Sequence, residues 1–418
     1  MQRDVLPQPI RRRFSLGSSA KFFYLAEAIT RVYEPTATQL SDLDRAYQST
    51  ADYLITCPEF EGLLYLVQAH GSRPLGTMVR PLEEFRDGFD IDLAAYLERE
   101  GLIRYGGPNG PALLIEHLYV ALKRYADRHD LKIARDDRCV TMTYAGGMKA
   151  DFAPIIDDPS HVVQHGDTHG RIPDRDLQRY VPTNPRGYCR VFNAIALTTP
   201  TFERRAELNA TFDSLRKSEV LPLPDAEEVF GRLPSRLVQL VKINRNISFV
   251  GPKSVTDVAP SSSFVTTLVA KAYSIEAPKP HDGPMDLLLD MVQLMGKLFE
   301  RRLLPDGSEF WFLENPTALN DNLAACMNTP AKQKAFDAWY ANMLETLNAL
   351  VDAIDRDAGI DVVARAVERA FGERAKTAVL EDNASRRESN RSAGRATLIA
   401  GGTAAVSTAS RAHTNFGD

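Results

Sequence analysis

The chain has few cysteines, no long apolar run and no excess of positive charge. Its four cysteines, at positions 57, 139, 189 and 326 of 418, form no CxxC pair. This spacing supports neither a zinc ribbon nor a disulfide framework, and free thiols suit a reducing cytosol. No stretch approaches the roughly 18 consecutive apolar residues of a membrane span, and the basic N-terminus lacks the apolar core of a signal peptide. We therefore expect a cytoplasmic protein without a membrane segment.

The charge balance argues against bulk binding to nucleic acid. The formal net charge is -5, from 50 Lys and Arg against 55 Asp and Glu. Proteins that coat nucleic acid are usually basic, although a local basic groove remains compatible with this balance. A chain of 418 residues exceeds one ordinary core and predicts two lobes.

Apolar periodicity divides the chain into a mixed first part and a helical second part. Helical spacing covers residues 20–55, interrupted at Pro35, and residues 116–129. Short apolar or alternating runs predict strands at 62–69, 88–97, 138–144 and 148–156, the last two joined as a hairpin. Further helices are expected at 234–247, 261–273, 284–299, 331–354 and 361–380. The composition from Glu381 onward predicts a disordered or partner-dependent tail.

Three acidic residues fall on these strands, after a Gly-Ser pair. Gly71 and Ser72 end the first strand and are expected to open a helix, where backbone N–H groups and a hydroxyl can bind phosphate. Asp90 and Asp92 stand at i and i+2, so both point to one face of a strand. Asp151 lies on the second strand of the hairpin. Carboxylates converging on otherwise apolar strands need a cation, which predicts two Mg²⁺ ions (or Mn²⁺) and phosphoryl transfer.

Each of these pieces has a simpler explanation when taken alone. An Asp-x-Asp pair is often a solvated strand edge, a Gly-Ser pair is usually a turn, and Asp151 could be a surface or capping residue. The apolar neighbours Ile91, Leu93 and Phe152 favour the metal site, because buried-type strands seldom carry unpaired acids.

Seven segments, in this order, resemble the bacterial CD-NTases, which are nucleotidyltransferases related to the animal cyclic GMP–AMP synthase and to oligoadenylate synthase. They are residues 70–77 (HGSRPLGT), 89–93 (FDIDL), 148–154 (MKADFAP), 183–188 (TNPRGY), 237–246 (LVQLVKINRN), 261–268 (SSSFVTTL) and 314–324 (ENPTALNDNLA). The resemblance covers about residues 60–330.

The resemblance implies an α+β fold with a polymerase-β-type core, in which a small mixed sheet is backed by helices from both ends of the chain. A helical C-terminal lobe would form the other wall of a central cleft. The implied organisation is N-terminal helices on the core (1–60), the catalytic core (61–185), an oligoadenylate-synthase-like helical lobe (186–380) and a flexible tail (381–418).

The implied activity is synthesis of a cyclic di- or trinucleotide from nucleoside triphosphates, ATP among them, in anti-phage (CBASS) signalling. By the motif match, Gly71 and Ser72 would bind the donor triphosphate. Asp90 and Asp92 would hold both metal ions, and Asp151 the ion that activates the acceptor 3′-hydroxyl.

Three further residues match nucleotide-contacting positions of the family. Lys242 and Ser262 would contact triphosphate, whereas the alternatives are a solvent-facing lysine and a helix N-cap. Tyr188 could stack on a base or pack at the lobe junction. The helix around Lys242 departs from the family where Ile243, Asn244 and Asn246 stand, since many members carry a basic or acidic residue there.

Several other features carry weaker hypotheses. His161, His165 and His169 have helical i, i+4 spacing, but the surrounding glycines and aspartates predict an exposed loop rather than a zinc site. The Arg11–13 run is expected to be solvated. The last residues, Gly417 and Asp418, resemble family tails that partner proteins conjugate, which would require removal of Asp418.

Two other functions remain open at this stage. An enzyme of the same fold could add nucleotides to an RNA end or to a protein, and a non-catalytic interaction protein could retain the fold. Regulatory or conjugating CBASS proteins are the partners that the resemblance implies.

Overall fold

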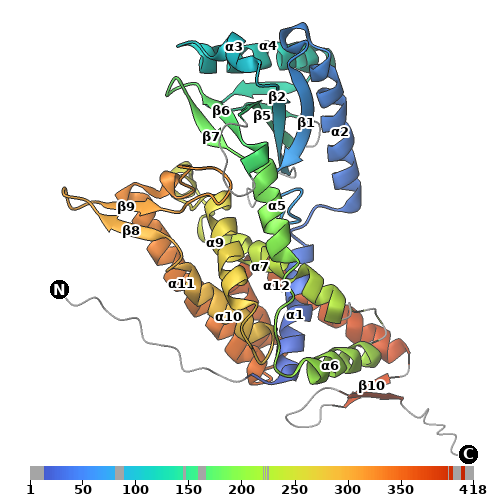
Figure 1. Ribbon diagram of the computed structural model, residues 1–418. Helices are drawn as coiled ribbons and strands as arrows, with labels where there is room; N and C mark the ends of the chain where they lie inside the picture. Colours follow the sequence, from blue (N-terminus) through green and yellow to red (C-terminus); the bar gives the residue numbers. More distant parts are fainter. Residues whose placement is uncertain are drawn as a thin grey trace, which may run out of the picture.

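The structure is a computed structural model with a sheet-containing half and a helical half, joined by helix α5 (Figure 1). It describes residues 14–80, 89–144, 147–158, 166–219, 221, 223, 226–393, 395–398 and 406–409. The predictions for the Arg11–13 run, for His161 and His165, and for Gly417 and Asp418 fall outside the described residues.

A seven-stranded mixed sheet forms the first half. Its strands run in the order β1-β2-β5-β4-β3, and β6 pairs with both β5 and β7. Only β2 and β5 are parallel, and the other pairs are antiparallel. The strands are β1 Leu64–His70, β2 Asp90–Leu97, β3 Lys132–Arg135, β4 Val140–Thr143, β5 Lys149–Asp157, β6 Gly170–Asp174 and β7 Arg179–Thr183. The two central parallel strands are mostly buried, as expected for strands covered on both faces.

Helices α2 and α4 cover this sheet and share its hydrophobic core, which includes Leu93, Leu118 and Phe152. Thr36 and Gln39 form a reciprocal capping box that starts α2 directly after the predicted break at Pro35. The helical segments of this half are α2 Ala37–Ile55, the 3₁₀ turn Pro58–Phe60, α3 Gly101–Tyr105, α4 Gly110–His129 and the 3₁₀ turn Gly166–Thr168.

The helical half has its own, larger core, in which Trp311 packs edge to face on Phe336 and Phe264 packs on Phe336 at a tilt. Its elements are α1 Leu16–Arg31, α5 Pro185–Ala196, α6 Arg205–Ser218, α7 Ala226–Ser248, α8 Lys253–Thr256, α9 Ser262–Glu276, α10 Pro284–Met295, β8 Glu300–Leu303, β9 Glu309–Phe312, the 3₁₀ turn Ala325–Met327, α11 Pro330–Asp355 and α12 Ile360–Ser392. The expected helices are present. The sequence analysis missed α5, α6 and the β6–β7 and β8–β9 hairpins.

The first helix does not pack on the sheet as the sequence analysis expected. Residues of α1 belong to the core of the helical half, and Figure 1 shows α1 beside α12. Arg236 of α7 explains part of this placement: its guanidinium donates to both carboxylate oxygens of Glu27 on α1, at 2.7 and 2.9 Å, and also reaches Glu34. Burial of this ion pair favours the packing of α1 on α7, because separating the two helices would leave each buried charge unpaired.

The last long helix also packs on the helical half, not on the sheet. Gly372 has φ +84° and breaks the helical geometry inside α12, and a Cβ there would lie 2.4 Å from Ile247 Cδ1. The carbonyls freed by this kink are satisfied, since Tyr33 donates to Phe371 O and the Asn244 amide donates to Ala370 O. Of the helices expected to back the sheet from both ends of the chain, α2 does so, whereas α1 and α12 do not.

The tail begins later than the sequence analysis predicted. Residues 381–392 continue α12, where Arg386 pairs with Asp382 at i, i+4 and Asn390 donates to Glu219 near the end of α6. Helix formers and these polar contacts stabilise a helix that has few large apolar side chains. A short antiparallel hairpin follows, formed by β10 Arg395–Leu398 and β11 Val406–Ala409.

All four cysteines are free in the structure, consistent with the absence of a disulfide framework. Within the described part of the chain, every helix is too short or too polar to cross a membrane.

Candidate active site

Three polar residues from the segments identified in the sequence lie in a row across the sheet. In the antiparallel pair β1–β2, His70 lies opposite Asp92, and in the parallel pair β2–β5, Asp92 lies opposite Asp151. Thr141 of β4 continues the row beyond Asp151. Neighbouring strands are about 4.8 Å apart, so the row brings Asp92 and Asp151 together on adjacent strands.

Gly71 is shaped by its contact with this row. It has φ +64°, and a Cβ at this position would lie 2.4 Å from Asp92 Oδ2. Only glycine allows the chain to turn this close to the carboxylate. Ser72 O accepts a hydrogen bond from Thr77 N, which closes the turn, and Arg73 pairs with Asp44 of α2 at 2.7 Å.

The prediction that Gly71 and Ser72 open a helix is wrong. Residues 71–76 form successive turns, with a second positive φ at Gly76, and residues 77–80 are irregular. The two left-handed glycines and Pro74 are incompatible with a regular helix. Any phosphate contact at this turn therefore comes from turn N–H groups instead of a helix dipole.

The electrostatics of the row favour a bound cation. Burial raises the pKa of Asp151, and the Asp92 carboxylate adds to the shift. The Thr141 hydroxyl, 2.5 Å from Asp151 Oδ1, opposes it. Burial lowers the pKa of His70 even though the carboxylates of Asp92 and Asp151 act in the opposite direction. A neutral imidazole leaves the negative charge of these acids uncompensated, so the row has the donor set and charge of a divalent metal site.

Asp90 completes the carboxylate set at the mouth of the site. It is exposed, stands two residues from Asp92 on β2 and lines the same cavity as Asp92 and Asp151. All three side chains offer oxygen, which is the ligand type that Mg²⁺ and Mn²⁺ prefer. The residues therefore fit the metal ions that the sequence analysis expected.

Lys242 faces this row from the helical half. It lies on α7 and is only 4% exposed, so the alternative of a solvent-facing lysine is wrong. Its ammonium donates to Thr77 O at 2.9 Å. Burial and the nearby Arg245 lower the pKa of Lys242 to about 7, although Asp92 acts to raise it. An anion in the cavity would restore the charge of this lysine.

Arg245 and Ser262 extend this second wall. Burial lowers the pKa of Arg245 to about 10, and its guanidinium donates to Ser262 Oγ and Pro260 O, both at 3.0 Å. The N-cap of α9 is Ser261, whose hydroxyl accepts from Phe264 N, so the N-cap alternative for Ser262 is wrong. The Ser262 hydroxyl is instead available at the first turn of α9, where N–H groups favour an anion.

Tyr188 and Asn184 lie where the two halves meet. The Tyr188 hydroxyl hydrogen-bonds the Thr267 hydroxyl on α9 at 2.7 Å. Asn184 caps α5 by accepting from Gly187 N at 2.9 Å, and its amide donates to Thr317 O at 2.9 Å. The TNPRGY segment therefore ties α5 to both α9 and the segment after β9, while Tyr188 also lines the cavity.

One cavity collects every predicted site residue. Its volume is about 1130 Å³, which exceeds the roughly 300–1,000 Å³ of most small-molecule pockets. The lining includes the predicted residues Gly71, Ser72, Asp90, Asp92, Asp151, Tyr188, Lys242 and Ser262. A cavity with acids on one wall and cations on the other suits a ligand that carries both metal ions and phosphates.

Comparison with known proteins identifies the fold. No protein-family model matches the chain. A curated relative, the cyclic dinucleotide synthase CdnG of Bradyrhizobium diazoefficiens, is 30% identical over 173 residues, a match that spans 39% of this chain and 38% of that relative. The solved structure of CdnG, described as a CD-NTase in complex with GTP, covers 87% of this chain and 98% of its own, at 21% identity and a TM-score of 0.57.

The chain has the fold of the CD-NTases.

Two other CD-NTase structures share the fold at lower identity. Escherichia coli MS115-1 CdnC, solved in a complex with HORMA-deltaN, covers 84% of this chain and 97% of its own, at 14% identity and a TM-score of 0.55. The Vibrio cholerae cyclic AMP–GMP synthase DncV, solved with nonhydrolyzable GTP, covers 87% of each chain at 16% identity and a TM-score of 0.50. The expected fold class is thereby confirmed.

Two residues of this site were missed by the sequence analysis. Thr141 was missed because a single threonine on an alternating strand carries no distinguishing signal. Arg245 was treated as part of a helix that departs from the family pattern, yet it lines the cavity one turn after Lys242. Helical i, i+3 spacing from Lys242 was the signal that could have found it.

Proposed function

We propose that this chain is a CD-NTase that acts as a cyclic oligonucleotide synthase, which makes a cyclic di- or trinucleotide from nucleoside triphosphates. The observation that carries the proposal is the single cavity whose sheet wall holds Asp90, Asp92 and Asp151 and whose helical wall holds Lys242 and Arg245. The solved relatives with GTP or ATP support nucleoside triphosphates as substrates.

The proposed chemistry is attack of a 3′-hydroxyl on an α-phosphate with loss of pyrophosphate. Asp90 and Asp92 would hold two Mg²⁺ ions, and Asp151 one of them. When bound, these ions supply charge neutralisation and activation of the acceptor hydroxyl. The O3′–P bond forms as the bond between the α-phosphorus and the oxygen that bridges it to the β-phosphate breaks, and pyrophosphate leaves. The proton of the 3′-hydroxyl passes to solvent on the side of the site that holds the carboxylates.

The remaining residues orient the donor triphosphate. The turn after Gly71 brings backbone N–H groups and the Ser72 hydroxyl beside the acids. Lys242, Arg245 and Ser262 approach from the opposite wall and complement the negative charge of the phosphates. Such fixed positioning is the main source of rate enhancement in phosphoryl transfer.

The cavity volume favours a cyclising enzyme over a simple transferase. A space of about 1130 Å³ can hold a donor and an acceptor nucleotide together. The linear intermediate would then turn over or rebind, so that its own 3′-hydroxyl attacks. Tyr188 would contribute a ring to the nucleotide site, while its hydroxyl holds α9.

Organisation and setting form part of the same proposal. We assign the catalytic core to residues 61–185 and the helical lobe to residues 186–380, with α1 added to the helical lobe. The protein would act in the cytoplasm in anti-phage (CBASS) signalling. The complex of the relative CdnC with HORMA-deltaN supports a regulatory protein partner, and conjugation of the tail after removal of Asp418 remains part of this hypothesis.

A product assay tests the function. The purified chain is incubated with four labelled nucleoside triphosphates and Mg²⁺ or Mn²⁺, treated with phosphatase and examined by mass spectrometry. A phosphatase-resistant cyclic product is expected. The Asp90→Asn/Asp92→Asn variant should lose at least ~10³-fold of the rate, since metal ions contribute several kcal/mol to the transition state.

The control is Asp127→Asn, which changes an exposed carboxylate on α4 and should leave activity unchanged. Equal product from the double variant would refute the metal site. Linear extension of added RNA or labelling of a protein would favour the rival transferase, and complete inactivity with every acceptor and cell extract would favour a non-catalytic interaction protein.

A further inference from the structure

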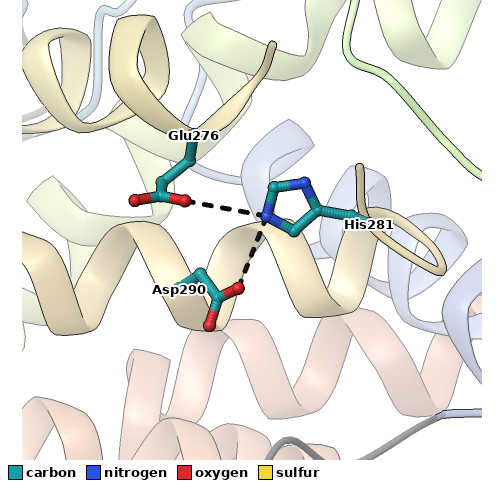
Figure 2. A group of neighbouring side chains, drawn as sticks. All are labelled: Glu276, His281 and Asp290. Carbon is teal, nitrogen blue, oxygen red and sulfur yellow. Dashed lines mark ion pairs between the residues drawn. The ribbon is translucent and has the colours of Figure 1, made fainter. Parts of the chain in front are cut away.

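A second group of metal-binding side chains lies far from the cavity, at the other end of α9. Figure 2 shows His281 between Glu276, the last residue of α9, and Asp290 on α10. The sequence analysis did not identify this group. A 15-residue helix rises about 1.5 Å per residue, so Glu276 stands roughly 20 Å from the cavity-lining Ser262 at the start of α9.

The donor atoms have the separations of a metal site. His281 Nε2 lies 3.4 Å from Asp290 Oδ2 and 3.9 Å from Glu276 Oε2. All three donor atoms lie within 4.8 Å of one another. Zinc binds nitrogen and oxygen at about 2.0–2.2 Å, so two ligands of a tetrahedral ion stand roughly 3.4 Å apart. Side-chain movements of about 1 Å would let one ion contact all three atoms.

The orientation of the imidazole is fixed in the form that a metal requires. His281 Nδ1 lies 2.8 Å from the carbonyl oxygen of Lys279. A carbonyl can only accept, so Nδ1 carries the hydrogen and Nε2 is directed at the two carboxylates. Metal-binding histidines commonly donate their other ring N–H to a carbonyl in this way.

The orientation of the Glu276 carboxylate is fixed as well. Lys279 binds Glu276 through Oε1 at 2.8 Å, which leaves Oε2 directed at the imidazole. The side chains of His281 and Glu276 are 3% and 9% exposed, whereas that of Asp290 is 37% exposed and provides access for an ion and a water ligand.

The backbone around His281 is pinned on both sides, so the group is rigid. His281 N donates to Thr201 O, and His281 O accepts from Glu203 N. These bonds join the loop between α9 and α10 to the segment between α5 and α6. Ligands supported by fixed backbone are those that hold an ion at defined geometry.

Further acidic side chains lie around the group. Asp286 lies one helical turn before Asp290, and burial together with Asp282 raises the pKa of Asp286 to about 7. Its Oδ2 is buried without a hydrogen-bond partner. Against these acids, Lys279 beside Glu276 and Arg204 near Asp282 supply two positive charges. The local balance is that of a site for a cation.

We propose that Glu276, His281 and Asp290 bind a divalent transition-metal ion of the zinc class, with water as the fourth ligand. One nitrogen and two carboxylate oxygens suit Zn²⁺, and a buried imidazole disfavours Mg²⁺ and Ca²⁺. The ion joins the end of α9, the following loop and α10. Because it joins these three segments, its role is structural.

The competing arrangement is a protonated His281 paired with the same two carboxylates. Burial by itself lowers the pKa of His281, but Asp290 and the Lys279 carbonyl outweigh burial and raise it. Both arrangements use the same side chains. Only the metal site binds zinc with defined stoichiometry.

Zinc binding to the full-length chain distinguishes them. The Asp90→Asn/Asp92→Asn variant serves as the background, because it removes metal binding in the cavity. Protein stripped with chelator is equilibrated with Zn²⁺, then measured by elemental mass spectrometry and by competition with a chromogenic chelator. One Zn²⁺ per chain and a zinc-dependent rise in Tm are expected.

Adding Asp290→Asn should weaken zinc binding more than ~100-fold, since even a group that only supports a ligand is worth roughly 10–100-fold. Asp290 is partly exposed and Asn has its shape, so the fold should persist. His281→Ala gives a second test, and the exposed His129→Ala is the control. Substitution by Co²⁺ should give the visible absorption of a four-coordinate ion. Absence of bound zinc, or equal affinity in Asp290→Asn, would overturn the proposal.

Discussion

The two walls of the cavity are positioned by different kinds of contact. On the sheet wall, the acids stand on two adjacent strands, and backbone pairing alone aligns Asp92 with Asp151. On the helical wall, Lys242 and Ser262 come from α7 and α9, and tertiary packing brings them together. The sheet wall is thus specified by strand register, whereas the helical wall exists only when the helical core is formed.

The electrostatic states of the walls are opposite and each is unfavourable alone. The sheet wall gathers carboxylates whose repulsion raises the pKa of Asp151 further after burial. The helical wall buries cations, and burial lowers the pKa of Lys242 and of Arg245. Bound metal ions would neutralise the carboxylates, and a bound triphosphate would neutralise the buried cations. The charges that favour binding therefore lower the stability of the empty fold.

Among the single substitutions that test this comparison, the largest loss of activity is expected on the sheet wall. Gly71→Ala adds a Cβ 2.4 Å from Asp92 Oδ2 and should lower product formation about 10²-fold, the effect of an ångström-scale misplacement. Gly62→Ala is a matched control, since Gly62 has φ +68° but no atom within 4 Å of the position that a Cβ would take. Equal losses in the two variants would assign the effect to backbone strain. The product assay measures both.

On the helical wall, Lys242→Met should increase stability while activity falls. The pKa of Lys242 is about 7 in the folded chain against an ordinary value of 10.5. The folded state therefore loses stability as pH falls from 10.5 to 7 and gains none back below 7. Removing the charge should stabilise the protein by up to ~5 kcal/mol at pH 7, reduced by the lost hydrogen bond to Thr77 O, with the gain falling as the pH rises toward 10.5.

Urea unfolding at several pH values measures this gain. Lys123→Met, on the exposed face of α4, should show no such pH-dependent gain. A Lys242→Met variant that is less stable at pH 7 would contradict the argument that burial penalises the charge of Lys242.

The junction of the walls should give a moderate effect. Asn184→Ala removes the cap of α5 and leaves Thr317 O without its amide donor, for a combined cost of about 2 kcal/mol in unfolding free energy. Ser261→Ala, which removes only the cap of α9, should cost about 1 kcal/mol. Urea unfolding that ranks Ser261→Ala as the more damaging variant would deny Asn184 its role between the halves.

The smallest effect is expected at Thr141. Its hydroxyl opposes the rise in the pKa of Asp151, so Thr141→Val should raise that pKa further. Activity that depends on the carboxylate should then be lost at higher pH as the solution is acidified. The acidic limb of the rate profile measures this shift, and Thr143→Val, two residues along the same strand, should leave the limb in place.

The same contrast explains how far the sequence was informative. Alternating strands and the i, i+2 spacing of Asp90 and Asp92 were visible because strand geometry is local. The buried state of Lys242 was not, since helical periodicity does not say what covers a helix face. The helix expected after Gly71 failed because two positive φ values at Gly71 and Gly76 cannot be read from a Gly-Ser pair.

Non-local contacts account for the other differences. Arg236 binds Glu27, which lies 209 residues earlier in the sequence, and this contact places α1 on the helical half and not on the sheet. Tail residues 381–392 stay helical through contacts with α6 and its neighbours. The trio around His281 was missed because it spans a helix end, a loop and a second helix, a pattern with no fixed spacing.

The parallel pairing of β2 and β5 has a consequence for when activity can arise. Residues 98–148 separate these strands, including all of α4, and antiparallel β4 must also find its place beside β5. Pairings of such long sequence separation form late, because the intervening chain must lose its freedom first. A nascent or partly refolded chain therefore holds Asp92 and Asp151 apart, and the proposed nucleotidyl transfer must await the completed topology.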